Sequence, residues 1–584
     1  MKTKELIFIT LFSALSITAI KAQSFQETAL PHITDTPSAS RSANFIDVNN
    51  DGWDDIFITN GPSSGQNNML YINNQDGTFT TVTSDVIVND GDRSDGASFA
   101  DADNDGDMDA FVVTWGAGGS GKKNYFYRNN GDGTFTYEPA IAMGLPLTYS
   151  EMANWIDINN DQNLDLYFTN SYQNLANKYY ENLGDGSFSE ISNLSITSEH
   201  FASRSIDWVD YDDDGDNDIF ITNEENEKNS LFRNDGANNF TQITNLAIVQ
   251  DFKNSVGSSW ADIDNDGDLD LFVANWANNG QANQLFINNN GIFSEDITSE
   301  IAASTTNSFG SSFGDVDNDG DLDLLVCNAY MASQNTNFLY MNDGNGNFTL
   351  DTSSEISNYQ GWTFGCAFGD YNNDGWLDVL LANNYNDNQS NALFRNSGTG
   401  NNWIKLNLVG TQSNYSAVGA KIRMRSTING NQVWQTRQIA AASGYCSQNS
   451  FTVHFGAGNA SLIDEIEVLW PSGLSETYTD IEVNRIYTAI EGDGSLGLEE
   501  NKIQEINLFP NPIQDSLTIA LDMSYASHSL IFQLFTLDGK RILEHPLEGT
   551  TNHHLNLKHL NSGTYLYIIT DETRIVSSGK LIKD

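Results

Sequence analysis

The chain repeats one arrangement of apolar and polar positions, and the repeats start 52 to 56 residues apart. In each repeat a short apolar run ends at an Asp- and Gly-rich loop, and a second run, such as residues 55–59 (Asp-Ile-Phe-Ile-Thr), leaves it. A second signature follows, as in residues 68–73 (Asn-Met-Leu-Tyr-Ile-Asn) and 77–79 (Gly-Thr-Phe). Period-two alternation on both sides of an Asn/Asp/Gly turn predicts a β-hairpin. We therefore expect four short strands in each repeat.

The repeat occurs seven times, and four strands per unit at this period are typical of a β-propeller blade. The seventh copy ends after Phe394 without a fourth strand, whereas residues 24–27 (Ser-Phe-Gln-Glu) resemble residues 187–190 (Ser-Phe-Ser-Glu). We predict that this N-terminal strand completes the last blade and closes the ring. The predicted fold class is all-β, with a seven-bladed β-propeller over residues 23–400.

An aromatic side chain stands two positions before the first aspartate of every acidic loop. These residues are Phe45, Phe99, Trp155, Trp208, Trp260, Phe313 and Phe368. We expect them to pack between neighbouring blades and assign them no further role.

The acidic loops have the spacing of a cation site. In residues 262–270 (Asp-Ile-Asp-Asn-Asp-Gly-Asp-Leu-Asp), oxygen ligands fall at positions one, three, five and nine, and Gly267 at position six permits a sharp turn. Four carboxylates this close together would oppose folding unless a hard cation bound them. Calcium fits best because it accepts six to eight oxygens in flexible geometry, and the backbone carbonyl at position seven supplies a fifth ligand.

Seven loops are predicted to bind up to seven Ca²⁺ ions in this way. The proposed ligands, loop by loop and with the carbonyl donor fourth, are Asp47, Asn49, Asp51, Trp53 and Asp55; Asp101, Asp103, Asp105, Asp107 and Asp109; Asp157, Asn159, Asp161, Asn163 and Asp165; Asp210, Asp212, Asp214, Asp216 and Asp218; Asp262, Asp264, Asp266, Asp268 and Asp270; Asp315, Asp317, Asp319, Asp321 and Asp323; and Asp370, Asn372, Asp374, Trp376 and Asp378. In the third loop Gln162 replaces the glycine. The alternative interpretation is a set of solvated turns, which Asp, Asn and Gly also favour.

The EF-hand is excluded by position twelve of the loops. That motif requires a glutamate there, but these loops have Ile58, Val112, Phe168, Ile221, Val273, Val326 and Leu381. Each of these residues belongs to a β-rich run, so we expect each loop to join two strands.

The net charge argues against polyanionic partners, and the N-terminal segment predicts export. Its 584 residues carry 78 Asp and Glu against 27 Lys and Arg, a formal charge of −51. Nucleic-acid binding and docking on an anionic bilayer are therefore not expected. Lys2 and Lys4 precede an apolar run over residues 6–20, so residues 1–22 are expected to be a secretory signal peptide. No other segment is long and apolar enough to span a membrane.

The three cysteines provide no metal-binding spacing. Buried free thiols and a Cys327–Cys366 bridge both fit their positions in the sequence.

The repeats resemble the FG-GAP/VCBS family, whose members form seven-bladed propellers with calcium between the first two strands of a blade. Residues 402–490 contain β-rich segments and the run 470–473 (Trp-Pro-Ser-Gly). They resemble the ASPIC/UnbV domain, which follows such repeats in the cartilage acidic protein family. After a predicted linker (491–503), residues 504–584 resemble the C-terminal sorting domain of the type IX secretion system. Both segments are expected to be small β-sandwich-like domains, and the second implies the type IX machinery as a partner and secretion or an outer-surface location.

Function is predicted from the loops between the second and third strands of the blades, at the face opposite the acidic loops. Five of these loops begin with an aromatic residue, Trp115, Tyr172, Trp276, Tyr330 or Tyr385, surrounded by Gly, Asn, Ser and Gln. Exposed aromatics next to amides suit stacking on a sugar or a contact with a protein partner. Packing at the blade ends is the alternative role.

We predict a calcium-binding module for adhesion to a glycan or a surface protein, without catalytic residues. No nucleophile elbow, phosphate loop, HExxH or CxxC motif is present. His454 lies in an apolar strand and is expected to be structural. The alternative is a polysaccharide lyase or hydrolase that uses loop side chains without a recognisable motif.

Overall fold

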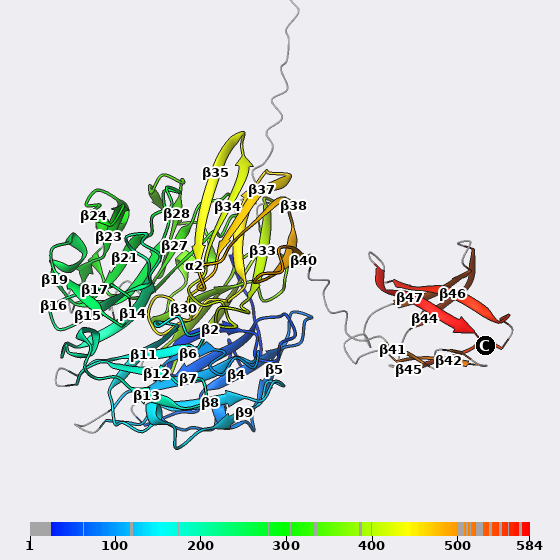
Figure 1. Ribbon diagram of the computed structural model, residues 1–584, viewed down its shortest axis with the longest axis horizontal. Coiled ribbons are helices and arrows are strands. Elements are labelled where there is room, and N and C mark those ends of the chain that lie inside the picture. Colours follow the sequence, from blue (N-terminus) through cyan, green and yellow to red (C-terminus); the bar gives the residue numbers. More distant parts are fainter. Residues whose placement is uncertain are drawn as a thin grey trace, which may run out of the picture.

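The computed structural model describes residues 25–583 apart from residues 62–63, 117–120, 173–174, 237, 278–279, 304, 331–335, 385–387, 399, 499–506, 510–511, 514–515, 521–529, 537–539, 548–551, 559 and 571–574. The predicted signal peptide (1–22) and Tyr385 lie outside the described residues. Strands make up nearly all of the regular secondary structure of the described residues, as predicted (Figure 1).

Seven antiparallel four-stranded sheets follow one another over residues 25–396, and we call each a blade. Their strands are, in chain order, β2 (Ser40–Ile46), β3 (Asp55–Asn60), β4 (Met69–Asn73), β5 (Phe79–Val82); β6 (Ser94–Ala100), β7 (Asp109–Thr114), β8 (Tyr125–Asn129), β9 (Phe135–Tyr137); β10 (Ser150–Ile156), β11 (Asp165–Asn170), β12 (Lys178–Asn182), β13 (Phe188–Glu190); β14 (Ser203–Val209), β15 (Asp218–Asn223), β17 (Ser230–Asn234), β18 (Phe240–Ile243); β20 (Ser255–Ala261), β21 (Asp270–Asn275), β23 (Gln284–Asn289), β24 (Ile292–Glu295); β26 (Ser308–Gly314), β27 (Asp323–Asn328), β28 (Phe338–Asn342), β29 (Phe348–Leu350); and β30 (Thr363–Gly369), β31 (Asp378–Asn383), β32 (Ala392–Asn396). The propeller pattern predicted from the repeats is therefore present.

The N-terminal strand completes the last blade. Strand β1 (Phe25–Glu27) pairs antiparallel with β32, with Phe25 opposite Asn396 and Glu27 opposite Phe394. The first strands of successive blades lie side by side, and β30 of the last blade contacts β2 of the first. The ring is thus closed by residues from both ends of the repeat region, and the prediction of this closure is confirmed.

Each acidic loop joins the first two strands of a blade. The second strand of every blade begins at the ninth residue of its loop, from Asp55 in the first blade to Asp378 in the last. Position twelve therefore lies inside a strand, as the exclusion of an EF-hand requires.

Short helices connect consecutive blades. They are η1 (Val86–Val88), η2 (Ala142–Gly144), η3 (Ser195–Thr197), η4 (Ala247–Val249), α1 (Glu300–Ala303) and α2 (Glu355–Asn358), the first four being 3₁₀ helices. Two small extra sheets pair β16 (Glu227–Lys228) with β19 (Phe252–Lys253), and β22 (Gln281–Ala282) with β25 (Thr305–Thr306).

Residues 402–498 form two further four-stranded sheets, which we call the second domain. One sheet has the order β36 (Val453–Gly458), β33 (Asn402–Val409), β39 (Arg485–Ile490), β40 (Leu496–Leu498). The other has the order β35 (Asn431–Gln438), β34 (Lys421–Ile428), β37 (Leu462–Leu469), β38 (Ser475–Glu482). Strand β40 falls in the predicted linker (491–503), so the sheet extends beyond residue 490. Glu491, at the start of that predicted linker, is buried and accepts the backbone N–H groups of residues 411–413.

The second domain packs on the face of the ring that carries the acidic loops (Figure 1). One continuous apolar cluster contains Trp155 and Trp208 of the blades together with Ile404, Ile422 and Trp470 of the second domain. Shared burial of this kind makes the two parts one cooperative unit.

A loop of the second domain fills the centre of the ring. Residues 439–452, between β35 and β36, form the segment that we call the plug. Gln448 pairs with Ala43 and Phe45 of the first blade through two backbone hydrogen bonds of 3.1 Å, and its side chain bonds the backbone of Phe99 in the second. The backbone N–H of Ser450 donates to Phe368 O of the last blade at 3.1 Å. The plug thus replaces the water that would otherwise solvate these inner strands.

The C-terminal residues form two more sheets with a core of their own. One has the order β41 (Asn507–Phe509), β42 (Ser516–Ala520), β45 (Asn552–Asn556). The other has the order β44 (Arg541–Leu547), β43 (Leu530–Thr536), β46 (Gly563–Thr570), β47 (Ile575–Lys583). Leu517, Leu530 and Phe532 are among the side chains buried between them.

Removal of the Phe25 ring should weaken closure of the propeller. Phe25 is 1% exposed and packs in a cluster formed by the last two blades. We expect Phe25→Ala to lower the free energy of unfolding by about 3–5 kcal/mol, measured by urea denaturation. Gln26→Ala, at an exposed position of the same strand, is the control. Equal stability of both variants would show that β1 does not hold the ring closed.

Candidate functional site

The first aspartate of every acidic loop folds the loop around its own carboxylate. Its Oδ2 accepts the backbone N–H of position six at 2.7–3.2 Å in all seven loops, from Gly52 onto Asp47 to Gly375 onto Asp370. The residue at position four has a φ between 53° and 60° in every loop, and the glycines at position six have φ between 83° and 104°. The sequence therefore produces seven copies of one tight acidic turn.

The ninth aspartate is buried at the start of the second strand. In each blade its Oδ1 accepts the backbone N–H of an asparagine on the third strand at 2.6–2.8 Å. These aspartates are at most 1% exposed. Burial raises the pKa of Asp109 and Asp270 to about 8 and that of Asp218 to about 9. A carboxylate in such a position needs a proton or a cation beside it.

The structure brings carboxylate oxygens together in four loops. Three such oxygens lie within 4.8 Å of one another in the groups Asp101/Asp103/Asp105, Asp210/Asp212/Asp218, Asp262/Asp264/Asp270 and Asp315/Asp317/Asp323. The other three loops have asparagine at position three, namely Asn49, Asn159 and Asn372, so they present fewer carboxylates. The donor set consists of hard oxygens, which is compatible with a calcium ion.

The third loop keeps the common geometry in spite of its substitution. Gln162 donates its backbone N–H to Asp157 at 2.8 Å, as the glycines do in the other loops. To do so it adopts a φ of 78°, which is unfavourable for a residue with a side chain. This loop is therefore formed but strained.

Two sets of asparagines that link neighbouring blades were missed by the sequence analysis. In six of the seven blades the asparagine that contacts the ninth aspartate also donates its side-chain N–H to a loop carbonyl of the adjacent blade, as from Asn129 to Val48 O at 2.8 Å and from Asn73 to Tyr371 O at 2.7 Å. At position four of the loops, Asn50 reaches Gly106 O at 3.1 Å, and Asn373 reaches Gly52 O across the closure of the ring. Their recurrence in register with the loops is the signal that could have identified them.

The second domain contacts the loops directly. The Lys405 ammonium lies 2.8 Å from a carboxylate oxygen of Asp370, and both residues are buried. Lys421 forms an ion pair with Asp213, and the backbone N–H of Gly456 donates to Asp315 at 3.1 Å. Two of the proposed ligands, Asp315 and Asp370, thus also hold this domain in place.

At the opposite face, two aromatic clusters lie at the end of the ring where Tyr445 of the plug meets the first strands, and we call this place the channel mouth. In the first, Tyr149 stacks on Tyr172 at 4.8 Å between ring centroids, and the Arg93 guanidinium lies 4.4 Å from the Trp115 ring. The indole N–H of Trp115 donates to Ser171 at 3.0 Å. Tyr172 is 47% exposed, whereas Trp115 is only partly exposed.

The second cluster joins Trp276, Tyr330 and Trp362. Tyr330 lies 4.6 Å from Trp362 between centroids and is 45% exposed. Its φ of 58° is rare for an aromatic residue, and such strain is concentrated at functional sites. The structure therefore brings four of the five predicted aromatics to one face of the ring, in two groups.

Charged side chains form the floor of this mouth. The second residue of successive first strands is Arg41, Asp95, Glu151 and Arg204, followed by Val256, Phe309 and Phe364. Arg204 pairs with Glu151 at 2.6 Å and also with Glu224, whose other oxygen accepts the Trp276 indole N–H at 2.6 Å. Tyr445 of the plug donates to Glu151 at 2.6 Å. One half of the floor is thus ionic and the other apolar.

The chain matches three known families. Residues 47–112, 157–221, 210–273, 262–326 and 329–381 match the FG-GAP-like repeat, residues 410–496 match ASPIC and UnbV, and residues 507–584 match the secretion system C-terminal sorting domain. The chain is an FG-GAP repeat protein with an ASPIC/UnbV domain. All seven acidic loops of the FG-GAP repeats lie within matched segments. The family resemblance inferred from the motifs is confirmed.

The sorting domain indicates an FG-GAP protein that is secreted or held at the outer surface through the type IX system. No helix among its described residues is long and apolar enough to cross a membrane. None of the three matching families is named for an enzymatic activity.

Among curated proteins, this FG-GAP protein is similar to cartilage acidic protein 1 of Xenopus tropicalis, with 28% identity over 280 residues that cover 46% of this chain and 42% of that protein. Cartilage acidic protein 1 of Homo sapiens is 28% identical over 278 residues, covering 46% and 41%. The match thus spans less than half the length of either relative.

Solved structures with a related outline include a lectin of Agrocybe aegerita that recognises non-reducing terminal N-acetylglucosamine (20% identity, 55% of this chain, 80% of that chain, TM-score 0.38). The BP39L lectin of Burkholderia pseudomallei is another (10% identity, 62% and 97%, TM-score 0.43). These scores are too low to transfer a ligand to the FG-GAP repeats of this chain.

His454 and the cysteines occupy structural positions. The Nε2 atom of His454 lies 3.2 Å from Gly375 O, and burial lowers the pKa of this imidazole to about 4. Cys327, Cys366 and Cys446 are buried free thiols, so the alternative of a Cys327–Cys366 bridge is not present in the structure.

The stability of the metal-free protein should fall as the pH rises. The buried ninth aspartates Asp109, Asp218 and Asp270 have pKa values of about 8 to 9, above the unfolded value of about 3.9. Between these values the metal-free native state binds more protons than the unfolded state, so stability decreases from about pH 5 to about pH 8. Calcium replaces these protons and should raise the melting temperature most at pH 8. Calorimetry at about pH 5 and about pH 8, with chelator or with calcium, tests this. If calcium leaves the melting curve unchanged at both pH values, the loops bind no metal.

Relief of the strain at Gln162 should stabilise the third blade. Gln162→Gly removes the unfavourable left-handed conformation of a residue with a side chain. We expect a gain of about 1 kcal/mol in the free energy of unfolding, measured in the presence of calcium. Gly215→Gln is the reciprocal control, because Gly215 has a φ of 95° and an added Cβ would meet nothing within 4 Å. A loss of stability in Gln162→Gly would show that the glutamine side chain has a role of its own.

Proposed function

We propose that this secreted or surface protein is a calcium-stabilised binding module whose channel mouth, opposite the acidic loops, binds a glycan. The observation that carries the proposal is the pair of aromatic clusters around the mouth. Tyr172 and Tyr330 are nearly half exposed, although each is held by a neighbouring ring, Tyr149 stacked on Tyr172 and Trp362 tilted against Tyr330. Rigid exposed rings of this kind offer flat apolar area at a low cost in conformational entropy.

The partly buried Trp115 and Trp276 support the surface in this proposal. Each donates its indole N–H to a neighbouring blade, Trp115 to Ser171 and Trp276 to Glu224. They position the exposed tyrosines and present only part of their rings to a ligand. Tyr385 is retained as a fifth member of the surface from its place in the sequence alone.

Calcium has a structural role in the proposal. The loops lie on the face that the second domain covers, away from the mouth. Ions bound only by the native state would stabilise it by mass action, and each would neutralise a buried carboxylate cluster. With up to seven ions bound, the ligands named loop by loop would hold the blades without touching the glycan.

Binding is favoured over catalysis because the carboxylates at the mouth are already engaged. Glu151 contacts Arg204 and Tyr445, and Glu224 contacts Arg204 and Trp276. A glycosidase needs two carboxyl groups free to face the scissile bond. The polysaccharide-degrading alternative would therefore require these contacts to break.

Loss of the exposed tyrosines should abolish glycan retention. We expect the double variant Tyr172→Ala/Tyr330→Ala to lose at least tenfold in affinity, since truncation of an aromatic anchor costs about 1–2 kcal/mol, with little change in melting temperature. The measurement is a glycan array followed by retention on the selected polysaccharide in calcium. Tyr415→Ala, 36% exposed beside the acidic loops, is the matched control.

Three other outcomes would overturn the proposal. Equal retention by the double variant would move the site away from the mouth, and shortened products would identify an enzyme. Absence of retention on every glycan, together with capture of a surface protein that the double variant does not bind, would assign the mouth to a protein partner.

A further inference from the structure

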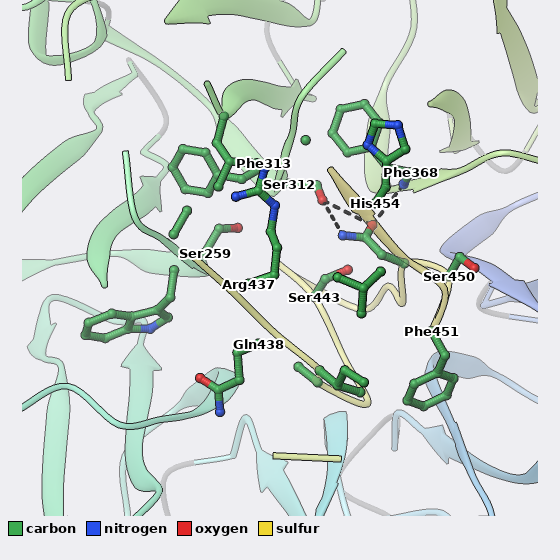
Figure 2. A pocket seen from close by; sticks show the side chains of 18 of the residues that line it. Ser259, Ser312, Phe313, Phe368, Arg437, Gln438, Ser443, Ser450, Phe451 and His454 are labelled. Atoms are coloured by element: carbon green, nitrogen blue, oxygen red, sulfur yellow. Dashed lines mark hydrogen bonds between the residues drawn. The ribbon is translucent and has the colours of Figure 1, made fainter. Parts of the chain in front are cut away.

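A chamber, which we call the axial chamber, lies between the first strands of the blades and the second domain (Figure 2). It has a volume of about 210 Å³. Its wall combines first strands of the blades (Ser259, Ser312, Phe313, Phe368), the plug (Ser443, Ser450) and the adjoining ends of β35 and β36, which carry Arg437 and His454. By this measure one water molecule requires roughly 10–15 Å³. The chamber is therefore much larger than a site for one or two bridging waters.

Aromatic rings form one side of this chamber. Trp208, Trp260, Phe313 and Phe368 line it, and they are four of the residues that precede the acidic loops. From their place in the repeats, we expect these rings only to pack between blades. Their contribution to the wall provides flat apolar surface inside an otherwise polar chamber.

Several buried polar atoms of the wall have no hydrogen-bond partner in the structure. They are the acceptors Asn154 Oδ1 and His454 Nδ1, the donors Trp208 Nε1 and Trp260 Nε1, and the hydroxyls Thr436 Oγ1 and Ser443 Oγ. Asn154 and Trp208 are 1% and 5% exposed. Native proteins rarely leave such atoms unpaired, because each carries a full desolvation penalty. Their concentration around one chamber is what bound water or a bound polar ligand would satisfy.

The charges of the wall restrict the class of that molecule. Arg437 forms no ion pair among the described residues, and its guanidinium donates to Thr436 O and Gln435 Oε1. Asp207, also in the wall, accepts from Ser258 and likewise has no ion pair in the described part of the chain. Asp54, Asp315, Asp370 and Lys405 also line the chamber, so its wall carries charges of both signs and neither a simple anion nor a simple cation is matched on every side.

Hydroxyl groups satisfy all of these requirements at once. A hydroxyl donates one hydrogen bond and accepts two, so it can serve both Asn154 Oδ1 and Trp208 Nε1. An anion only accepts and would leave Asn154 and His454 unsatisfied. An ammonium cation only donates hydrogen bonds, so it would leave the Trp208 N–H unsatisfied. It would also be repelled by the positively charged Arg437 in the wall. A ring bearing several hydroxyl groups also has the C–H surface that stacks on aromatic side chains.

We propose that this axial chamber binds one neutral polyhydroxylated small molecule of monosaccharide size, held between the ring and the second domain. The site is separate from the channel mouth and does not depend on the function proposed for it. The ligand would contact residues of the blades, the plug and strands β35 and β36, so its binding would tighten the second domain on the ring.

The test is isothermal titration of the full-length secreted protein, in calcium, with glucose, galactose, mannose and N-acetylglucosamine. We expect one of them to bind with a stoichiometry of one. Trp208→Phe removes the unpaired N–H and keeps the ring, and it should weaken that binding about fivefold, the equivalent of one hydrogen bond. Without sugar, Trp208→Phe should fold normally, since the indole N–H has no protein partner.

Trp155→Phe is the matched control. Trp155 is buried in the neighbouring blade, but its indole N–H donates to Ser98 O at 3.3 Å and the residue does not line the chamber. It should leave sugar affinity unchanged. Tyr172→Ala/Tyr330→Ala, which alters only the mouth, should also retain the monosaccharide.

Four outcomes would overturn the proposal. These are absence of heat with every sugar at millimolar concentration, equal affinity of Trp208→Phe and the wild type, loss of binding in the mouth variant, and preferential binding of glucuronate or of an amino acid over the neutral sugars. Loss in the mouth variant alone would support the function proposed for the mouth and place the monosaccharide there.

Discussion

The architecture depends on seven buried carboxylates, one at the start of the second strand of each blade. Each accepts a backbone N–H from the third strand, so a single side chain connects the acidic turn, the second strand and the third. The same asparagine that donates this N–H reaches the adjacent blade through its amide. Local turn geometry, the hairpin and the contact between blades therefore share one group of atoms. A buried negative charge at this point is stable only when a proton or a cation accompanies it, which joins the fold to the ionic conditions around it.

Much of this arrangement follows from the sequence because it is local. Loop, strand and turn lie within one repeat, and their spacing fixes which residues face each other. The closing strand was also predictable, since residues 24–27 carry the pattern that the seventh repeat lacks. Even the position of the aromatic residues at the opposite face followed from the alternation of strand direction, although their division into an exposed pair and a supporting pair did not.

Long-range contacts account for what the sequence did not reveal. The plug has no periodic pattern, and nothing in residues 439–452 indicates that Gln448 meets Ala43 about four hundred residues earlier in the chain. The axial chamber has no motif because its wall is assembled from several blades and a second domain. The asparagines between blades were visible in the sequence but had no assigned role, since their partners lie in a different repeat. The strand at residues 496–498 was missed because a Gly- and Asp-rich approach resembles a linker.

The plug completes the centre of the propeller. Its backbone pairs with the first blade and hydrogen-bonds the last, so it spans the junction where the ring closes. The plug is therefore a structural connection at the centre of the ring. Blades that would otherwise contact only their neighbours also contact this one segment. A chain that stopped near residue 400 would contain every blade and the closing strand, yet Ser98, Phe99 and Ser312 at its hub would lose the partners that the plug gives them.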